Sequence, residues 1–315
     1  MVATLVKPPE GTVPAVAVRG VFKRYGPFAA VDGVDLDIAP GELFGLIGHN
    51  GAGKSTLFKM MLGLLSPSAG QIEIEGVQVQ GAHFRSVRQR IGYLPENVVL
   101  YDNLTGQETL AFFARLKSCP VSDCSRVLEV VGLAQAGQKR VREYSKGMRQ
   151  RLGFAQALLG QPRILFLDEP TTGLDPEAIR EFYDTLKLLR DQGVTVVLTS
   201  HILAEIQTRV DRLAVMKAGR IQAMGTVAHL REALDLPVQI VLTSRSAQEA
   251  AALGERLAPL ALTPLADGRL ALYCAQAEKL RVLGLLAGCE SMLNDIQIIE
   301  PSLEDVFLSM KGPRA

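Results

Sequence analysis

This 315-residue sequence has no long apolar run and almost no net charge. A membrane-spanning helix needs about 18 or more consecutive apolar residues, and no such run occurs, so the sequence predicts no transmembrane helix. The formal net charge is +1, which creates no large electrostatic field to attract nucleic acid or acidic lipid. We therefore expect no nucleic-acid partner. The charge balance does not exclude a local basic patch.

Cysteine is also scarce. Its four positions are Cys119, Cys124, Cys274 and Cys289. None forms the C-x-x-C pattern of a zinc site or a redox motif, and four cysteines in a chain of this length do not make a disulfide scaffold. We expect reduced thiols. Residues 1–13 contain prolines and no adequate apolar core, which predicts a disordered leader and not a signal peptide.

A phosphate-binding motif dominates what the sequence does contain. Residues 48–56 (GHNGAGKST) match the pattern G-x-x-x-x-G-K-[S/T], with an apolar strand predicted at 43–47 and a helix at 55–65. The glycines let the backbone N–H groups point inward, and the helix N-terminus favours an anion. Lys54 could reach the β- and γ-phosphates, and the Ser55 hydroxyl could bind Mg²⁺. This stretch predicts a nucleoside triphosphate site.

Two acids follow the next buried strand, at 164–167. Asp168 could hold Mg²⁺, and Glu169 could orient or deprotonate an attacking water. A further strand at 194–198 leads to His201 at the same predicted edge of the sheet. His201 could bind the γ-phosphate, or it could be an ordinary solvated residue at the end of a strand.

Two other positions allow two interpretations each. Ser145, Lys146, Gly147 and Met148 open a predicted helix that runs to about residue 160, so they are either a second phosphate contact or a well-capped helix start. Tyr25 lies in the turn between two strands predicted within 15–38, where it would either stack on a base or pack within the strand pair.

The chain divides into three segments by pattern. The predicted leader (1–13) precedes an α/β nucleotide-binding domain at 14–225, which includes a helical insertion at about 97–160. The remainder, 226–315, is predicted to follow the order β-α-β-β-α-β, which favours a small ferredoxin-like α+β domain. It contains no cluster of catalytic residue types, so we interpret it as an interaction or dimerisation module.

Together, these residues resemble the ATP-binding subunit of an ABC transporter over residues 16–225. Residues 48–55 match the Walker A loop, 164–168 with Glu169 the Walker B strand and catalytic glutamate, 144–150 the signature motif, 173–175 the D-loop, His201 the switch histidine and Tyr25 the adenine-stacking aromatic. The resemblance implies an ATP hydrolase with a P-loop NTPase fold: a RecA-like core, an antiparallel β subdomain and a helical subdomain.

The same resemblance implies the site residues, cofactors and partners. Its cofactors would be ATP and Mg²⁺, with Lys54, Glu169 and His201 catalytic and Ser55, Asp168 and Glu96 near the metal. Nucleotide contacts would come from Tyr25, Asn50, Gly51, Ala52, Gly53, Lys54, Ser55 and Thr56 and, from a second copy in a head-to-tail homodimer, from Ser145, Lys146, Gly147 and Met148. Permease subunits would dock at residues 97–117 and hold the protein peripherally on the cytoplasmic face of the inner membrane.

Two departures from the family pattern point to its exporter branch. The usual Leu-Ser-Gly-Gly-Gln signature is Tyr-Ser-Lys-Gly-Met here, and Glu96 replaces the usual lid glutamine, which leaves direct Mg²⁺ ligation at Glu96 open. His49 and the strings at 94–98, 144–152 and 301–305 resemble the NosF-like subfamily, which belongs to the copper-associated transporter serving nitrous-oxide reductase maturation. That resemblance would add a periplasmic accessory protein. The alternatives are a drug or lipid exporter ATPase and a soluble ABC ATPase outside transport.

Overall fold

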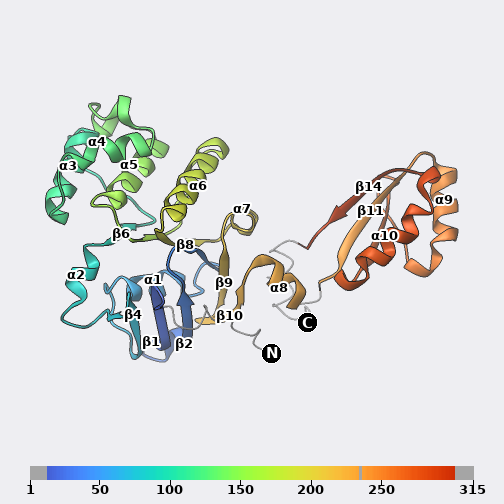
Figure 1. Ribbon diagram of the computed structural model, residues 1–315, viewed down its shortest axis with the longest axis horizontal. Coiled ribbons are helices and arrows are strands. Elements are labelled where there is room, and N and C mark those ends of the chain that lie inside the picture. The colour runs from blue at the N-terminus through green and yellow to red at the C-terminus, as the bar shows by residue number, and fades with distance from the viewer. Residues whose placement is uncertain (1–12, 234–235, 302–315) are drawn as a thin grey trace. The chain divides into compact units, whose positions relative to one another are not determined.

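The computed structural model describes residues 13–233 and 236–301 (Figure 1). The chain forms two compact units, residues 1–226 and residues 227–315. The predicted leader lies outside the described residues except for Val13, and so does a helix predicted at 303–310. Within the described residues, no helix has both the length and the apolar character needed to cross a membrane.

A six-stranded sheet forms the centre of the first unit, in the order β10-β9-β3-β8-β7-β6. Its strands are β3 (Leu43–Ile47), β6 (Ile91–Leu94), β7 (Ile164–Leu167), β8 (Thr195–Ser200), β9 (Arg212–Lys217) and β10 (Arg220–Gly225). The strands from β9 to β6 are parallel, and β10 pairs antiparallel with β9 at one edge. β3, β7 and β8 are buried along their whole length, as expected for parallel strands covered on both faces.

An antiparallel sheet with the order β2-β1-β4-β5 lies beside this core (Figure 1, blue and cyan). It consists of β1 (Val16–Tyr25), β2 (Phe28–Ile38), β4 (Ala69–Ile74) and β5 (Val77–Gln78), with α2 (Phe84–Arg88) following. Helix α1 (Lys54–Met61) shares one apolar core with both sheets, and the rings of Phe58 and Phe166 meet edge to face at 5.4 Å. The helix that follows the phosphate loop is therefore fixed from two sides.

Three helices lie between β6 and β7 and pack on one another (Figure 1, green). They are α3 (Gly106–Lys117), α4 (Asp123–Val130) and α5 (Lys146–Leu158), with short 3₁₀ turns at Ala134–Ala136 and Val141–Glu143. Thr105 begins α3 with a capping box, because its hydroxyl accepts from the Glu108 backbone N–H while the Glu108 carboxylate accepts from the Thr105 N–H. After β7 come α6 (Pro176–Asp191) and, between β8 and β9, α7 (Leu203–Ile206).

The second unit contains one four-stranded antiparallel sheet in the order β12-β13-β11-β14. Its elements are α8 (Val227–Ala233), β11 (Val238–Ser244), α9 (Ala247–Arg256), β12 (Thr263–Pro264), β13 (Leu270–Cys274), α10 (Lys279–Ala287) and β14 (Leu293–Ile299), with 3₁₀ turns at Ala258–Leu260, Gln276–Glu278 and Glu290–Met292. From β11 onward the element order is β-α-β-β-α-β. The strand expected near residues 260–265 is only two residues long, because a 3₁₀ turn and a left-handed residue at Ala261 precede it.

Candidate functional site

The candidate site lies where β3, β7 and β8 end. These strands are neighbours in the sheet and parallel, so their carboxyl ends meet at one edge, where ligands of open α/β sheets bind. The phosphate loop follows β3, Asp168 and Glu169 follow β7, and His201 follows β8. The topology therefore brings together side chains that are more than 140 residues apart in the sequence.

Two glycines give the phosphate loop its shape. A Cβ atom on Gly48 would lie 2.3 Å from the Met216 carbonyl oxygen, and one on Gly53 would lie 2.3 Å from the Ala30 carbonyl oxygen. Gly53 also has a φ of 104°, which side chains rarely adopt. The loop fits only because the backbones of β2 and β9 can approach glycine this closely.

The hairpin between β9 and β10 holds the loop from behind. The Gly219 N–H donates to the Ala52 carbonyl at 3.0 Å, and the Asp32 N–H donates to the Gly219 carbonyl at 2.9 Å. Backbone hydrogen bonds of Gly219 thus connect the phosphate loop to β2 of the antiparallel sheet.

Lys54 is a buried cation at the start of α1. Its Nζ donates to the Gly48 carbonyl at 2.7 Å and lies 3.7 Å from Oε1 of Glu169. The ammonium therefore lies between the phosphate loop and the acid that follows β7, a position from which both are within reach of a bound phosphate.

Glu169 is held in an unusual backbone conformation. Its φ is 48°, which is uncommon for a residue with a side chain, and its N–H donates to the Thr199 hydroxyl at 2.9 Å. Its Oε2 lies 2.7 Å from Nδ1 of His201. This buried carboxylate has one oxygen facing the imidazole and the other facing the Lys54 ammonium, and the residue lines the same cavity as the phosphate loop.

Asp168 lies deeper in the same site. It is buried, and its Oδ1 accepts a hydrogen bond from the Thr199 hydroxyl at 2.6 Å. Burial raises the pKa of Asp168 above its ordinary value, and the charges of Glu169 and Glu96 raise it further, whereas the Thr199 hydrogen bond and Lys54 oppose the shift. A cation bound beside Asp168 would relieve this cost.

A cavity of about 390 Å³ collects most of the predicted residues. It is lined by Phe28, Ala30, Asn50, Gly51, Ala52, Gly53, Lys54, Ser55, Thr56, Glu96, Glu169, Thr172 and His201. Glu96, Glu169 and His201 therefore face the phosphate loop across one cavity, as the sequence predicts.

The donor set near the loop can be tested for Mg²⁺. No group of three or more His, Cys, Asp or Glu side chains suited to a metal ion occurs among the residues that the structure describes. Mg²⁺ usually takes one or two protein ligands and completes its shell with substrate phosphates and water. The Ser55 hydroxyl and the Asp168 carboxylate are ligands of that type. Ser55 and the exposed Glu96 line the cavity, whereas Asp168 is buried and is not among the described residues that line it.

Phe28 and Thr172 line the cavity although the sequence did not single them out. Phe28 pairs with Tyr25 across the β1–β2 hairpin, and the residue is 62% exposed. Tyr25, the predicted base-stacking residue, is 52% exposed and lies beside Lys23, but it is not among the described residues that line the cavity. The signal available in the sequence was an aromatic on each side of one turn, with no means of choosing between them.

We expect Phe28→Ala to weaken ATP binding about fivefold or more, and Tyr25→Ala to have a smaller effect. Stacking a base on an aromatic ring contributes about 1–3 kcal/mol, and only Phe28 borders the cavity. Titration calorimetry with ATP would measure this. Tripolyphosphate, which has no base, serves as the control ligand and should bind both variants like the wild type. A larger loss in Tyr25→Ala than in Phe28→Ala would contradict the assignment.

The predicted signature residues lie elsewhere. Ser145 caps α5, with its hydroxyl accepting from the Met148 N–H at 3.2 Å, so the capped-helix interpretation holds within one chain. None of Ser145, Lys146, Gly147 and Met148 is among the described residues that line the phosphate cavity. The Lys146 side chain instead lies against Gly173 of the predicted D-loop, since a Cβ there would come within 2.4 Å of its Cε.

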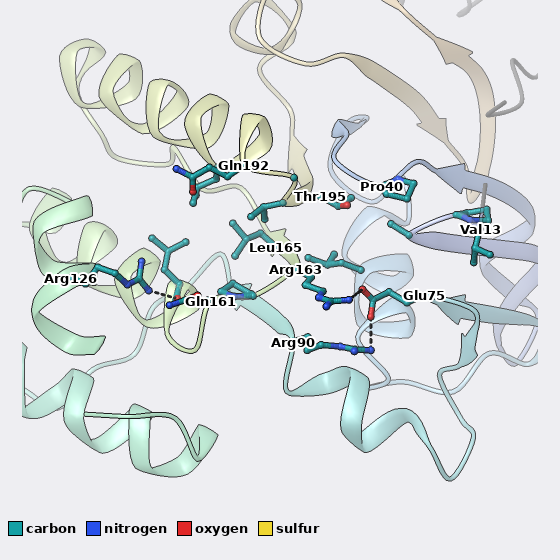
Figure 2. Close-up of a pocket in the computed structure, with 18 residues that line it drawn as sticks. Val13, Pro40, Glu75, Arg90, Arg126, Gln161, Arg163, Leu165, Gln192 and Thr195 are labelled. Atoms are coloured by element: carbon teal, nitrogen blue, oxygen red, sulfur yellow. Dashed lines mark hydrogen bonds and ion pairs between the residues drawn. The ribbon is translucent and has the colours of Figure 1, made fainter. Parts of the chain in front are cut away.

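A second cavity, of about 960 Å³, opens at the opposite edge of the sheet, near the amino ends of β7 and β8 (Figure 2). Arg90 and Arg163 both point toward Glu75, at 2.6 Å and 3.8 Å (Figure 2). These ion pairs connect the β4–β5 turn to the parallel sheet. No residue of the phosphate loop lines this cavity, so the chemistry belongs to the smaller one.

Comparisons with known proteins agree with this geometry. A family model described as "ABC transporter" matches residues 31–172. The daunorubicin resistance ATP-binding protein DrrA3 of Streptomyces coeruleorubidus is 39% identical over 312 residues, covering 95% of this chain and 96% of that protein. The linearmycin resistance ATP-binding protein LnrL of Bacillus subtilis is 33% identical, covering 93% and 97%. A solved structure of the ATP-binding subunit of an ABC transporter superposes with a TM-score of 0.64 at 31% identity, covering 69% of this chain and 92% of that one.

Proposed function

Since the chain belongs to the ATP-binding subunits of ABC transporters, we propose that it is one half of a head-to-tail ATPase dimer that drives a separate exporter permease. The observation that carries this proposal is the division of its motifs. Each chain has one phosphate loop, and its signature residues do not line the cavity of that loop. A second copy can supply Ser145, Lys146, Gly147 and Met148 to the open side of the site.

Each residue of the site has a role in this proposal. The loop N–H groups and Lys54 bind the phosphates, and Phe28 or Tyr25 supports the base. Ser55 and Asp168 would hold Mg²⁺, with Glu96 facing the same cavity. Mg²⁺ when bound supplies positive charge that offsets the charge of the phosphates. Glu169 accepts the proton of the attacking water, and His201, 2.7 Å from that carboxylate, keeps it in place. The exposed N-terminus of α5 in the second copy completes the contact with the phosphates.

The named relatives favour drug export over copper delivery. DrrA3 and LnrL are named for resistance to daunorubicin and linearmycin, and a relative from Rhizobium sp. that is 36% identical over 95% of this chain is named for Nod factor export. The NosF-like role inferred from His49 and three short strings has no support among these relatives, nor has the periplasmic partner that went with it. We therefore propose as cargo an amphipathic small molecule or lipid.

The surface at residues 97–117 suits a permease. Val99, Tyr101 and Leu116 are 86%, 59% and 67% exposed, and Phe112 packs edge to face on Tyr101 at 6.0 Å. Exposed apolar side chains gathered on one segment mark an interaction site. Docking here would hold the protein peripherally on the cytoplasmic face of the membrane.

Co-purification tests this docking. The full chain is expressed with a candidate exporter permease and purified in detergent, and the ATPase-to-permease ratio is measured. We expect the Tyr101→Asp, Leu116→Asp double variant to lower that ratio about tenfold or more, because charge replaces apolar contact in the interface. The control, Leu188→Asp, changes a residue on α6 that is also 63% exposed and should leave the ratio unchanged. Equal recovery of the double variant and the wild type would place the permease elsewhere.

A further inference from the structure

A group of polar side chains behind the site is not used by the mechanism above. It consists of Thr171, Tyr183, Glu205 and Arg209, called here the Glu205 cluster. Thr171 follows β7, Tyr183 lies on α6, Glu205 lies on α7 and Arg209 lies one turn beyond it. The Thr171 hydroxyl donates to Oε2 of Glu205 at 3.3 Å, and the Arg209 guanidinium lies 4.5 Å from the centre of the Tyr183 ring.

The cluster repeats a connection already made at the catalytic centre. Glu169 meets His201 at 2.7 Å, and two residues further along the chain Thr171 meets Glu205, which follows His201 by four residues. The segment after β7 and the segment after β8 are therefore joined twice. The second link fixes α7, so it also fixes the distance between the Glu169 carboxylate and the imidazole.

The Arg209 end of the Glu205 cluster packs against α6. Arg209 donates to the Ile179 carbonyl at 3.3 Å in addition to covering the Tyr183 ring. The contact with an aromatic face and a carbonyl holds the residues after α7 against a long helix. α7 itself has only four residues, so these side-chain contacts, and not its own length, determine where it lies.

Glu205 has a carboxylate oxygen in surroundings that disfavour a charge. Its Oε1 is buried and accepts no hydrogen bond from the described residues. Burial raises the pKa of Glu205, with the charge of Glu169 adding to the shift, while the Thr171 hydrogen bond, Arg209 and His201 oppose it. Glu205 is half-buried, and a carboxylate with a buried, unpartnered oxygen costs more than an apolar side chain would. Acids in such surroundings cluster at functional sites.

We propose that Glu205 is a positioning residue for ATP hydrolysis. It acts through Thr171 and α7 to keep the Glu169 carboxylate and the His201 imidazole at hydrogen-bonding distance. The inference rests on the proposed role of Glu169 and adds a residue that touches neither the phosphates nor the attacking water. Loss of the link should shift the two groups relative to each other. It should therefore slow turnover while leaving the phosphate loop, and with it ATP affinity, unchanged.

The test measures turnover number and ATP dissociation constant separately in the full chain. We expect Glu205→Ala to lower the turnover number about 10- to 100-fold, the range expected for misplacing a catalytic group, with ATP affinity within about twofold of wild type. Thr171→Val should do the same. The double variant should be no slower than the slower single variant, because both remove one link.

Two conservative variants separate positioning from folding. Thr171→Ser keeps the hydroxyl and Glu205→Gln keeps an oxygen that accepts from it, so both should stay within about threefold of wild-type turnover. If Glu205→Ala fails to fold, the comparison of Thr171→Val with Thr171→Ser carries the test. Glu181→Ala changes an exposed acid on α6 and serves as the matched control, with no expected effect.

Three results would overturn the inference: wild-type turnover in Glu205→Ala, a parallel loss of ATP affinity, or additive losses in the double variant. A different result would instead contradict the proposed role of Glu169. That result is Glu169→Gln turning over ATP like the wild type. An active wild type, an inactive Glu169→Gln and a fully active Glu205→Ala would disprove the positioning role alone.

Discussion

Glu169→Gln is expected to lower the rate of ATP hydrolysis about a thousandfold while ATP binding stays close to that of the wild type. A general base contributes about 10²- to 10⁴-fold, and an amide cannot take the proton of the attacking water. The substitution keeps the size of a side chain confined between Lys54 and His201, so the loop should retain its shape. Phosphate release measures the rate, and calorimetry measures the affinity.

The same variant should accumulate as a dimer when ATP is present. In the proposed mechanism ATP hydrolysis reopens the closed dimer, and this variant cannot hydrolyse the bound ATP. Gel filtration with and without ATP would show the shift. Glu181→Gln, an exposed acid on α6, is the control and should remain as active as the wild type. Near wild-type hydrolysis by Glu169→Gln would remove Glu169 from the mechanism.

Asp168→Asn is expected to lower activity about 10- to 100-fold and, at the same time, to stabilise the protein without nucleotide. The proposed Mg²⁺ contact loses its charge, which accounts for the loss of activity. Removing a buried carboxylate that lies near Glu169 and Glu96 should raise the melting temperature at pH 7 by about 2–4 °C, equivalent to about 1 kcal/mol in a unit of this size. The amide oxygen can still accept from Thr199.

The pH dependence of that stabilisation has a definite sign. Folding raises the pKa of Asp168 above its ordinary value of 3.8, so this group favours the folded state fully below about pH 3.8 and loses that contribution as pH rises through its folded pKa. The gain in Asp168→Asn should therefore be largest near neutral pH and shrink on acidification. Asp184→Asn, an exposed acid on α6, is the control. A melting temperature lower than that of the wild type at pH 7 would show that the Asp168 charge stabilises the fold.

The predicted P-loop α/β fold is confirmed, and short-range signals explain why it was predictable. Residues 43–47 and 164–167 are apolar runs ended by glycine or acid, and the structure has strands with those bounds. Parallel strands bury both faces, so such runs stand out in the sequence. Because catalytic side chains follow strand ends, locating the strands also located Asp168, Glu169 and His201.

The features of the site that the sequence did not predict depend on contacts between segments far apart in the chain. Phe28 lines the cavity and Tyr25 does not, although the two are direct partners across the β1–β2 hairpin, and nothing local in the sequence distinguishes them. Thr199 binds both Asp168 and the Glu169 backbone, yet it is an ordinary strand residue in the sequence. The Glu205 cluster joins three elements through side chains, and no local pattern predicts such a meeting.

The position of β3 has a consequence for how the protein is made. β3 and the phosphate loop come early in the chain, but both neighbours of β3 in the sheet, β8 and β9, come after residue 194, and the backbone tie at Ala52 needs Gly219. Contacts this far apart in sequence form slowly and late. During synthesis the loop is therefore complete long before β8, β9 and Gly219 are available to hold it. ATP can stabilise only a finished first unit, so a truncated or stalled chain gains no protection from the nucleotide.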